Sequence, residues 1–554
     1  MNQSRAAARK QGAGRKSQKQ ADEAVASDDA LDMGNYRIDR LPRRERSTTE
    51  LWMARAGIPL AILVFLLFGF AWTPEFLTTF GTEVLPNQAL RVFEEVGREE
   101  MIRRNVFMLA VFLVGMILWT AQSIPNYLTS LIVIISLVFT GVLTEREAYA
   151  QLGHPIMWLN IMSFILASML VKTGLAKRFT LWFLLKFGSS ASRVFLSFIV
   201  INVTLSAFIS ATTAKAAILL PIFMVIAAIY GSRPGSGKGN FGRNIVLQNL
   251  LNINLGAGAF VTGSGANLLA AALISGAIAG GVFFADWMIA MLPTMLGLML
   301  IGYIIGLKFV FPLQDKEKLP QVEGGMARLK KEYDKLGPVR WDEIRAAVIF
   351  LSILSLWATD RLHGISPTAI AFVGGIVALM PRIGIVDWND VDIPWHLMLF
   401  SAGAYCLGAG FAQTGLPNIA VDAFFTRIGL DQDTPFWVLY LILTGVMAYS
   451  ALLSQSKTMR AMIFVPIAIG TAQHFDYPVI SLALPVAFLI EHVYVLPFNS
   501  KPAALLYETD MYSLTDAIKY GLVMMTLGWL AIIVMGETWF RVLGITPNGV
   551  FGFF

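Results

Sequence analysis

Charge is scarce in this sequence. Asp, Glu, Lys and Arg make up 14% of its 554 residues, against about 25% of a typical soluble domain. Hydrophobic residues make up 56%, and the mean hydropathy is +0.63. This balance excludes an ordinary soluble protein. The net charge of +6 does not indicate a nucleic-acid partner, because the basic residues gather in the N-terminal tail and in a few loops.

Cysteine and catalytic motifs are also in short supply. Cys406 is the only cysteine, so an intrachain disulfide is excluded. The motifs HExxH and G-x-S-x-G are missing, and five His with one Cys offer no metal cluster. The loop GSRPGSGKGN, residues 231–240, has the wrong glycine spacing for a phosphate loop, and its Lys precedes Gly. We therefore expect no enzyme, no metal and no cofactor.

Apolar runs dominate almost the whole chain after Leu51. Runs long enough to cross a bilayer, about 20 residues, recur along it and predict an all-α polytopic membrane protein. Two segments, 189–231 and 435–472, are long enough to enter the membrane and return as re-entrant hairpins, and each precedes a broken segment. The expected spans lie at 51–72, 105–121, 127–143, 158–171, 289–311, 346–357, 365–380, 395–411 and 520–535.

Composition divides the chain into five parts. Residues 1–50 are polar, carry mixed charge and lack the apolar core and cleavage site of a signal peptide. We expect a disordered cytosolic tail there, although a lipid-binding or partner-binding tail stays open. The other parts are 51–104, a first transmembrane span with an amphipathic linker; 105–312, a first repeat; 313–342, a charged cytosolic linker; and 343–554, a second repeat.

The two repeats share a detailed pattern. ATTAKAAILLPI (211–222) and SKTMRAMIFVPI (456–467) align without gaps, with Thr third, a basic residue fifth and Pro-Ile at the end. Each is followed by a segment broken at its centre, by TGSGAN in the first repeat and by PFNSKP in the second. Two matched pairs in the same order indicate an internal duplication, and an odd number of spans in each half makes the repeats inverted.

Paired broken segments in inverted repeats indicate a binding site near the membrane midplane of a secondary transporter. Irregular backbone at that depth survives only beside protein or a water-filled cavity. The tips SATTA, TGSGAN, SQSKT and FNSKP offer hydroxyls, amides and lysines, and new helices starting there add unpaired N–H groups. Such a site suits an oxyanion or a carboxylate, and its basic excess disfavours a cation.

The basic loops indicate the orientation. Basic residues collect in the N-terminal tail, in KTGLAKRF (172–179) and in the loop at 231–244, which places these parts in the cytoplasm. We therefore expect an inner (plasma) membrane protein with a cytoplasmic N-terminus. The stretch PRIGIVDWNDVDIP (381–394) would be cytoplasmic as well although it is acidic, so the charge rule is not obeyed everywhere.

At these motifs the chain resembles the divalent anion/sodium symporter family of dicarboxylate, citrate and sulfate transporters. The likeness covers roughly 105–540 and rests on the hairpin motifs, on GSGAN (263–267), on LPFNSKPAALLYE (496–508) and on ILWTAQSIP (117–125). It implies a homodimeric elevator carrier that holds its substrate between the hairpin tips and binds sodium beside each tip. The substrate-binding residues implied are Thr212, Thr213, Ser264, Asn267, Ser456, Lys457, Thr458, Ser500 and Lys501.

The departures from the family pattern concern the implied sodium sites. At the first site the family's hydroxyl positions fall on Ala207 and Ala211, and its Asn position is Thr212. At the second site a Thr position is Leu452 and the Asn position is Lys457. An ammonium at a sodium position supplies the same unit charge permanently. We therefore expect Lys457 to act as a sodium-mimicking cation and transport to need no sodium.

Four other residues keep alternatives open. Lys215 and Arg460 occupy equivalent positions inside the two hairpins, and either contact with the substrate or support of residues that touch it fits them. Glu491 and His492 precede the second break. In one interpretation they couple transport to protons, since His titrates near neutral pH. In the other, Glu491 neutralises one of the lysines and His492 is a packed polar residue.

The expected function is secondary transport of small organic or inorganic anions, most readily di- or tricarboxylates, by exchange or linked to protons. A sulfate or sulfonate carrier, a sodium-coupled symporter, a cation/proton antiporter and a channel remain alternatives. The expected partners are the anionic substrate, the lipid bilayer and a second copy of the chain, with no nucleic acid. Fold analogy alone cannot select the anion.

Overall fold

The computed structural model describes residues 31–33, 48–278, 281–322, 324–391, 393–429, 434–454 and 456–552. Most of these residues form helices, and the described part of the chain contains no strand. Six helices are long and apolar enough to cross a membrane. The expected all-α polytopic class is therefore confirmed. The tail expected at 1–50 falls almost entirely outside the described residues.

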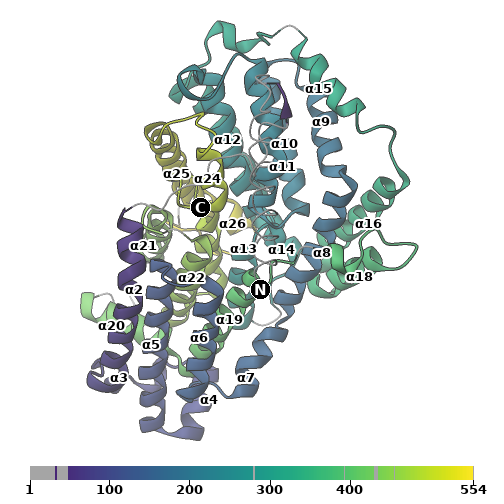
Figure 1. Ribbon diagram of the computed structural model, residues 1–554. Helices are drawn as coiled ribbons and strands as arrows, with labels where there is room; N and C mark the ends of the chain where they lie inside the picture. Colours follow the sequence, from purple (N-terminus) through teal and green to yellow (C-terminus); the bar gives the residue numbers. More distant parts are fainter. Residues whose placement is uncertain are drawn as a thin grey trace, which may run out of the picture.

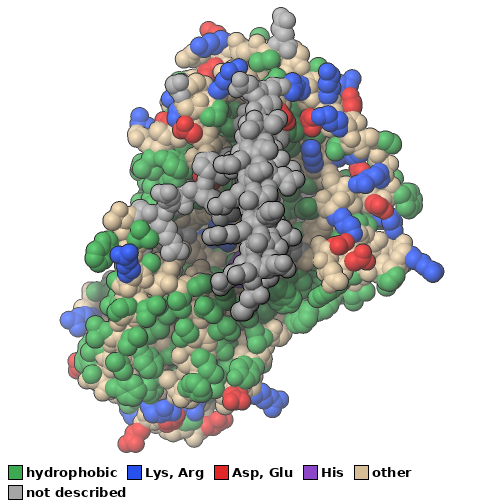
Figure 2. Space-filling view, viewed as in Figure 1, with side chains coloured by type: hydrophobic (Ala, Val, Ile, Leu, Met, Phe, Trp, Pro, Cys, Tyr) green, Lys and Arg blue, Asp and Glu red, His purple; other side chains and the backbone are tan. Residues whose placement is uncertain are grey.

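The first helices form an apolar group at one end of the molecule. Helix α2 has few buried residues and packs along α5, and Figure 2 shows hydrophobic side chains covering this part of the surface, with charged side chains at its lower rim. Such an exposed apolar face suits contact with lipid. The bounds are α2 Thr48–Leu66, extended by a π-helical turn Leu67–Ala71, α3 Phe76–Thr79, α4 Asn87–Val96, α5 Arg98–Ala121, α6 Asn126–Phe139 and α7 Glu145–Ala150.

Two series of seven helices then follow in the same order. Each series runs as a long helix, a shorter helix, a helical hairpin, a broken helix and a closing helix. The first series is α8 Pro155–Thr173, α9 Leu175–Phe187, α10 Ala191–Phe208, α11 Thr212–Ile229, α12 Gly239–Gly258, α13 Gly265–Ala277 and α14 Phe284–Ile305. The second is α19 Trp395–Thr414, α20 Leu416–Ile428, α21 Phe436–Tyr449, α22 Lys457–His474, α23 Val479–Phe488, α24 Lys501–Tyr507 and α25 Leu514–Glu537.

The halves interlock instead of standing side by side. Helix α6 packs on α19 and α8 packs on α18, so each half supplies a partner for a long helix of the other. The linker helix α15 lies at the opposite end of the molecule from α3, α4 and α7 (Figure 1). The remaining helices are α15 Gly325–Asp334, α16 Trp341–Ala358, α17 Asp360–His363, α18 Pro367–Leu379 and α26 Trp539–Val542.

One expected loop is wrong. KTGLAKRF (172–179) covers the end of α8 and the start of α9. The reversal needs only Gly174, whose φ of 74° is left-handed, and Gly415 (φ 66°) does the same between α19 and α20. The motif Thr-Gly-Leu at both places was a sequence signal for this turn. Arg178 is also not a loop charge, since it is buried and bound to Glu343.

The glycine-rich loop before α12 binds an internal carboxylate. Glu317 accepts the backbone N–H of Asn240 at 2.7 Å and of Phe241 at 3.1 Å, at the first turn of α12. The free N–H groups of a helix start attract anions. The Glu317 carboxylate therefore takes the place that a phosphate takes in a phosphate loop.

Candidate functional site

Both broken helices restart at a serine. Helix α12 ends at Gly258, and α13 begins after Ser264, whose Oγ accepts the N–H of Asn267 at 3.2 Å. Helix α23 ends at Phe488, and α24 begins after Ser500, whose Oγ accepts the N–H of Ala503 at 3.3 Å. Serine is a favoured residue at this position because its short side chain satisfies an otherwise unpaired donor. The duplicated motifs thus produce the same local structure twice.

The hairpin tips start helices of their own. Ser456 Oγ accepts the N–H of Met459 at 3.3 Å at the start of α22. Ala211 stands in the same place before α11 and has no side-chain oxygen. The starts of α11, α13 and α22 all line one cavity. Because each start carries unpaired N–H groups and the positive end of a helix dipole, the cavity is electrostatically suited to an anion.

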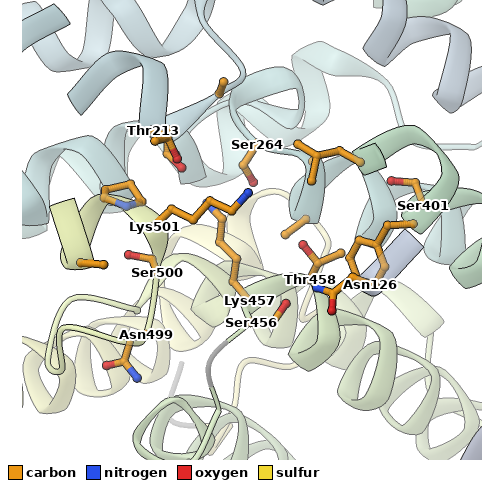
Figure 3. A pocket seen from close by; sticks show the side chains of 18 of the residues that line it. Asn126, Thr213, Ser264, Ser401, Ser456, Lys457, Thr458, Asn499, Ser500 and Lys501 are labelled. Atoms are coloured by element: carbon orange, nitrogen blue, oxygen red, sulfur yellow. The ribbon is translucent and has the colours of Figure 1, made fainter. Parts of the chain in front are cut away.

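The cavity has a volume of about 440 Å³ and lies between two walls from different parts of the chain (Figure 3). The hairpins and broken helices supply Ser210, Ala211, Thr212, Thr213, Ser264, Gly265, Ala266, Ser456, Lys457, Thr458, Phe498, Asn499, Ser500, Lys501, Pro502 and Ala504. The opposite wall, from α2, the α5–α6 corner, α8 and α19, supplies Met53, Thr120, Ala121, Gln122, Asn126, Asn160, Phe164, Leu397, Phe400 and Ser401.

Most of the predicted substrate-binding residues line this cavity. They come from four segments far apart in the sequence, and their direct contact with substrate stays a prediction. The lining residues among them are Thr212, Thr213, Ser264, Ser456, Lys457, Thr458, Ser500 and Lys501. Asn267 does not line it, because its amide is buried and donates to the carbonyls of Ala257 at 2.9 Å and Phe260 at 3.1 Å. It fastens the break between α12 and α13.

Lys457 and Glu491 form a buried ion pair beside the cavity. The Lys457 Nζ lies 2.7 Å from Glu491 Oε2 and 3.0 Å from Oε1. The Glu491 carboxylate is fully buried and also accepts the hydroxyl of Ser264. Hairpin α21–α22 is thereby joined to both broken helices. Of the lysines near it, Lys457 is the one that Glu491 contacts directly.

Arg460 does not line the cavity, and its guanidinium joins α22 to the segments that follow α21 and α23. It is 1% exposed, and its guanidinium donates to Ser450 Oγ at 3.0 Å, to the carbonyls of Ile490 and Leu489 at 3.2 Å each, and to the carbonyl of Met447. These carbonyls belong to the last turn of α21 and to the 3-10 turn Leu489–Glu491 that directly follows α23, where helix dipoles are negative. The charge is therefore compensated without a carboxylate of its own.

Lys215 occupies the matching position in the first hairpin, with a sparser environment. It is fully buried, and its Nζ donates to Ser206 Oγ at 2.8 Å. Among the described residues it has no carboxylate at ion-pair distance. Neither Lys215 nor Arg460 lines the cavity.

His492 is packed in the core behind the site. Its ring lies 5.4 Å from the Phe488 ring and 5.7 Å from the Tyr494 ring, and neither ring nitrogen has a hydrogen-bond partner in the described part of the chain. It does not line the cavity. No hydrogen bond joins the Glu491 and His492 side chains among the described residues, and a proton relay through the two stays a prediction.

Among the described residues that line the cavity, Lys501 is the cation without a partner. Its side chain is exposed to the cavity and reaches toward Ser264 (Figure 3). Its ammonium has no hydrogen-bond or ion-pair partner among the residues that the structure describes. Asn499, one residue from Ser500, fixes the loop by accepting the N–H of Leu496 at 2.7 Å and donating to the carbonyl of Ser454 at 3.3 Å.

Sequence reasoning missed the opposite wall and Asn499. Gln122 ends α5 in a left-handed conformation, with φ 49°, which is uncommon outside glycine and often marks functional sites. Asn126 and Ser401 flank the same side of the cavity in Figure 3. The stretch ILWTAQSIP contained a signal, since its Pro after a span predicts a corner. The contributions of α2, α8 and α19 depend on tertiary packing.

Fold and cavity together define an all-helical, polytopic membrane transporter with paired hairpins and broken helices. Residues 99–546 match the family model described as the sodium:sulfate symporter transmembrane region, and the chain belongs to that family. The resemblance to the divalent anion/sodium symporters is thereby confirmed. Helix α2 precedes the matched region.

Several known proteins are similar to the chain. A membrane protein of Cupriavidus necator is 22% identical, over 79% of this chain and 87% of its own. The sodium-dependent dicarboxylate transporter SdcS of Staphylococcus saprophyticus is 25% identical, over 76% and 83%. The chloroplastic dicarboxylate transporter 1 of Arabidopsis thaliana is 25% identical, over 80% of each chain. The solved YdaH transporter of Alcanivorax borkumensis aligns with a TM-score of 0.47 and 14% identity, over 79% of this chain and 99% of that chain.

Proposed function

We propose that this protein carries small multivalent anions, with dicarboxylates as the preferred class. The observation that carries the proposal is a charge imbalance around the cavity. Lys457 and Lys501 line the cavity and Lys215 and Arg460 are buried behind it, whereas Glu491 is the one carboxylate that contacts any of these cations among the described residues. Three helix starts add further positive potential. A cation substrate would be repelled, which argues against a cation/proton antiporter.

The preference for dicarboxylates comes from the relatives. Proteins similar over most of the chain are named dicarboxylate transporters in a bacterium and in a plant. The family model's description names sulfate, so a sulfate or sulfonate carrier is the second candidate. Both share the same chemistry, an oxyanion bound by lysine and backbone N–H groups. No enzymatic role is proposed.

Transport does not require sodium in this proposal, because Lys457 supplies the positive charge. Its ammonium contacts both oxygens of Glu491 and stands at the hairpin tip where the family resemblance places a sodium ion. A bound sodium would compete with a covalently attached cation of the same charge. Energy would then come from exchange of anions or from protons.

The cavity's two walls support an elevator mechanism. The duplicated hairpins and broken helices form one wall as a unit, and α2, α5, α6, α8 and α19 form the other. A wall that carries the anion can slide past the other, as in carriers built from inverted repeats. We further propose a homodimer in the inner membrane with the N-terminus and α15 on the cytoplasmic side, where the basic loops would lie.

A ligand screen by thermal unfolding tests this proposal. Purified protein in sodium-free buffer is heated with succinate, malate, citrate, sulfate or taurine. Specific binding stabilises the native state by about 2.7 kcal/mol at a hundred times Kd, so at least one dianion should raise the unfolding temperature. If no anion in the panel raises it, with or without sodium, the proposed function is contradicted.

A further inference from the structure

The cavity's two walls differ in chemistry. The hairpins and broken helices contribute lysines and hydroxyls. The opposite wall contributes Phe164 from α8 and Leu397 and Phe400 from α19, with Met53 at its edge. That wall also carries neutral polar groups, but it has no charged side chain among the described lining residues. A ligand in the cavity therefore meets charge on one side only.

The available charge is concentrated further by the Lys457–Glu491 pair. Because that pair is internally neutral and Lys215 and Arg460 lie outside the lining, Lys501 is the free cation that a ligand can reach among the described lining residues. Anionic groups will gather beside Lys501 and the starts of α11 and α13. The rest of the ligand then extends toward Phe164, Leu397 and Phe400.

The cavity as a whole is large. Its volume of about 440 Å³ falls within the range of roughly 300–1,000 Å³ found for pockets that hold drug-sized ligands. Phe164 and Phe400 present only part of their rings to it, 9% and 5% exposed, while Leu397 is half-buried. A four-carbon dicarboxylate would leave these apolar surfaces uncovered. An apolar substituent on the ligand would cover them, and aromatic rings add a preference for aromatic partners.

We propose that the preferred substrate is a dicarboxylate with a bulky apolar or aromatic substituent, and that Phe164, Leu397 and Phe400 determine this specificity. The inference rests on the proposed function, since it takes the two-headed anion as given. It also fits a sliding mechanism. Apolar contacts have no fixed direction, so the apolar part of a ligand held by the hairpin wall can move past Phe164, Leu397 and Phe400 without breaking hydrogen bonds to them.

The test compares two ligands that share their carboxylates. Affinities of the full-length protein for succinate and for 2-phenylsuccinate are measured by isothermal titration calorimetry in sodium-free buffer. Burying roughly half of a phenyl ring is worth about a tenfold gain in affinity, so phenylsuccinate should bind about ten times more tightly. In Leu397→Trp, where the added indole fills the space, the ratio of the two affinities should fall to about one.

Two further variants assign the effect to the wall. Phe400→Ala removes the ring and should lower the ratio as well; because Phe400 also packs edge-on to Trp119 at 5.6 Å, Leu397→Trp decides the point if Phe400→Ala misfolds. Phe309→Ala removes an exposed ring outside the cavity and should leave the ratio unchanged.

A ratio of one or less in the unaltered protein overturns the inference but not the proposed function. An unchanged ratio in Leu397→Trp overturns the residue assignment. Failure of both ligands and of every other anion to bind overturns the proposed function itself.

Discussion

Lys457 and Arg460 lie three residues apart on α22, yet they face different environments. Lys457 is at the cavity and pairs with a buried carboxylate. Arg460 is turned inward and binds carbonyls at two helix ends. A charge within a membrane is costly unless it is paired or reaches a cavity. Both residues meet that condition, one through an ion pair and one through helix dipoles.

The ion pair predicts a sodium dependence that can be introduced. Lys457→Asn leaves the Glu491 carboxylate buried without its cation, which should cost about 3–5 kcal/mol of stability. Sodium can then neutralise that carboxylate. The unfolding temperature of this variant should therefore be higher in sodium buffer than in choline buffer. The unfolding temperature of the unaltered protein should be the same in both buffers. Equal sodium stabilisation of both proteins would contradict the role given to Lys457.

The guanidinium of Arg460 predicts that lysine is a poor replacement. Arg460→Lys keeps the charge but cannot reach four acceptors at once. It should lose at least about 2 kcal/mol of stability, since hydrogen bonds to charged groups contribute about 1.5–3 kcal/mol each. The matched control is Arg427→Lys on the exposed face of α20, which should stay within about 0.5 kcal/mol. Equal losses in denaturant unfolding would show that Arg460 has no special structural role.

At the scale of elements, the linker between the halves is fastened to α9. Arg178 binds Glu343 at the start of α16 and donates to the carbonyls of Leu336 and Gly337 at 3.0 Å each. Its guanidinium also lies 5.7 Å from the centre of the Tyr333 ring of α15. The segment KTGLAKRF (172–179) looked like a cytosolic loop in the sequence. Its second half is instead the start of α9, and Arg178 in it fixes the linker between the repeats.

Removal of that anchor should expose the linker. Arg178→Met leaves the buried Glu343 with only the longer contact to Arg340, at 3.5 Å, and should cost about 3 kcal/mol, the low end for breaking a buried ion pair. Trypsin should then cleave at Lys330 and Lys331 faster than in the unaltered protein. Lys177→Met is the control, because its contact with Glu332 is long, 4.0 Å, and half exposed, and exposed pairs contribute about 0–1 kcal/mol. Similar cleavage rates in both variants would contradict the anchoring role.

The sequence predicted the hairpins and breaks well because they depend on local chemistry. Ser264 and Ser500 start helices through contacts three residues away, and such contacts leave a readable motif. The sequence did not reveal which cations face the cavity. Arg460 and Lys501 carry the same charge in similar tips, and only the packing of α21, α23 and α24 separates them. Phe164 and Phe400 looked like ordinary span residues for the same reason.

At the scale of the whole molecule, the cavity lies where two units meet. Thr120 on α5 contacts Met459 on α22 across that boundary, with Oγ1 and Sδ 3.2 Å apart. Thr120 lines the opposite wall of the cavity, whereas Met459 belongs to α22 of the second hairpin. If one wall moves relative to the other during transport, this contact must break in each cycle.

A reversible bridge across the boundary tests that movement. Thr120→Cys with Met459→Cys, bridged by mercuric ion, should abolish most of the transport in proteoliposomes, and excess free thiol should restore it. The control pair, Asn202→Cys with Asn249→Cys, joins α10 to α12 within one unit, where the two amide groups are 3.0 Å apart, and its bridge should leave transport intact. The native Cys406 is buried and should not react. Full activity of the first bridged pair would contradict the elevator mechanism.

The protein as a whole is expected to transport anions with the ammonium of Lys457 in place of sodium. Counterflow tests this in proteoliposomes loaded with unlabelled succinate or 2-phenylsuccinate, with the corresponding labelled anion outside. We predict saturable accumulation of the label at the same rate in sodium and in choline buffers. A rate that collapses when choline replaces sodium would show that Lys457 does not take the place of sodium.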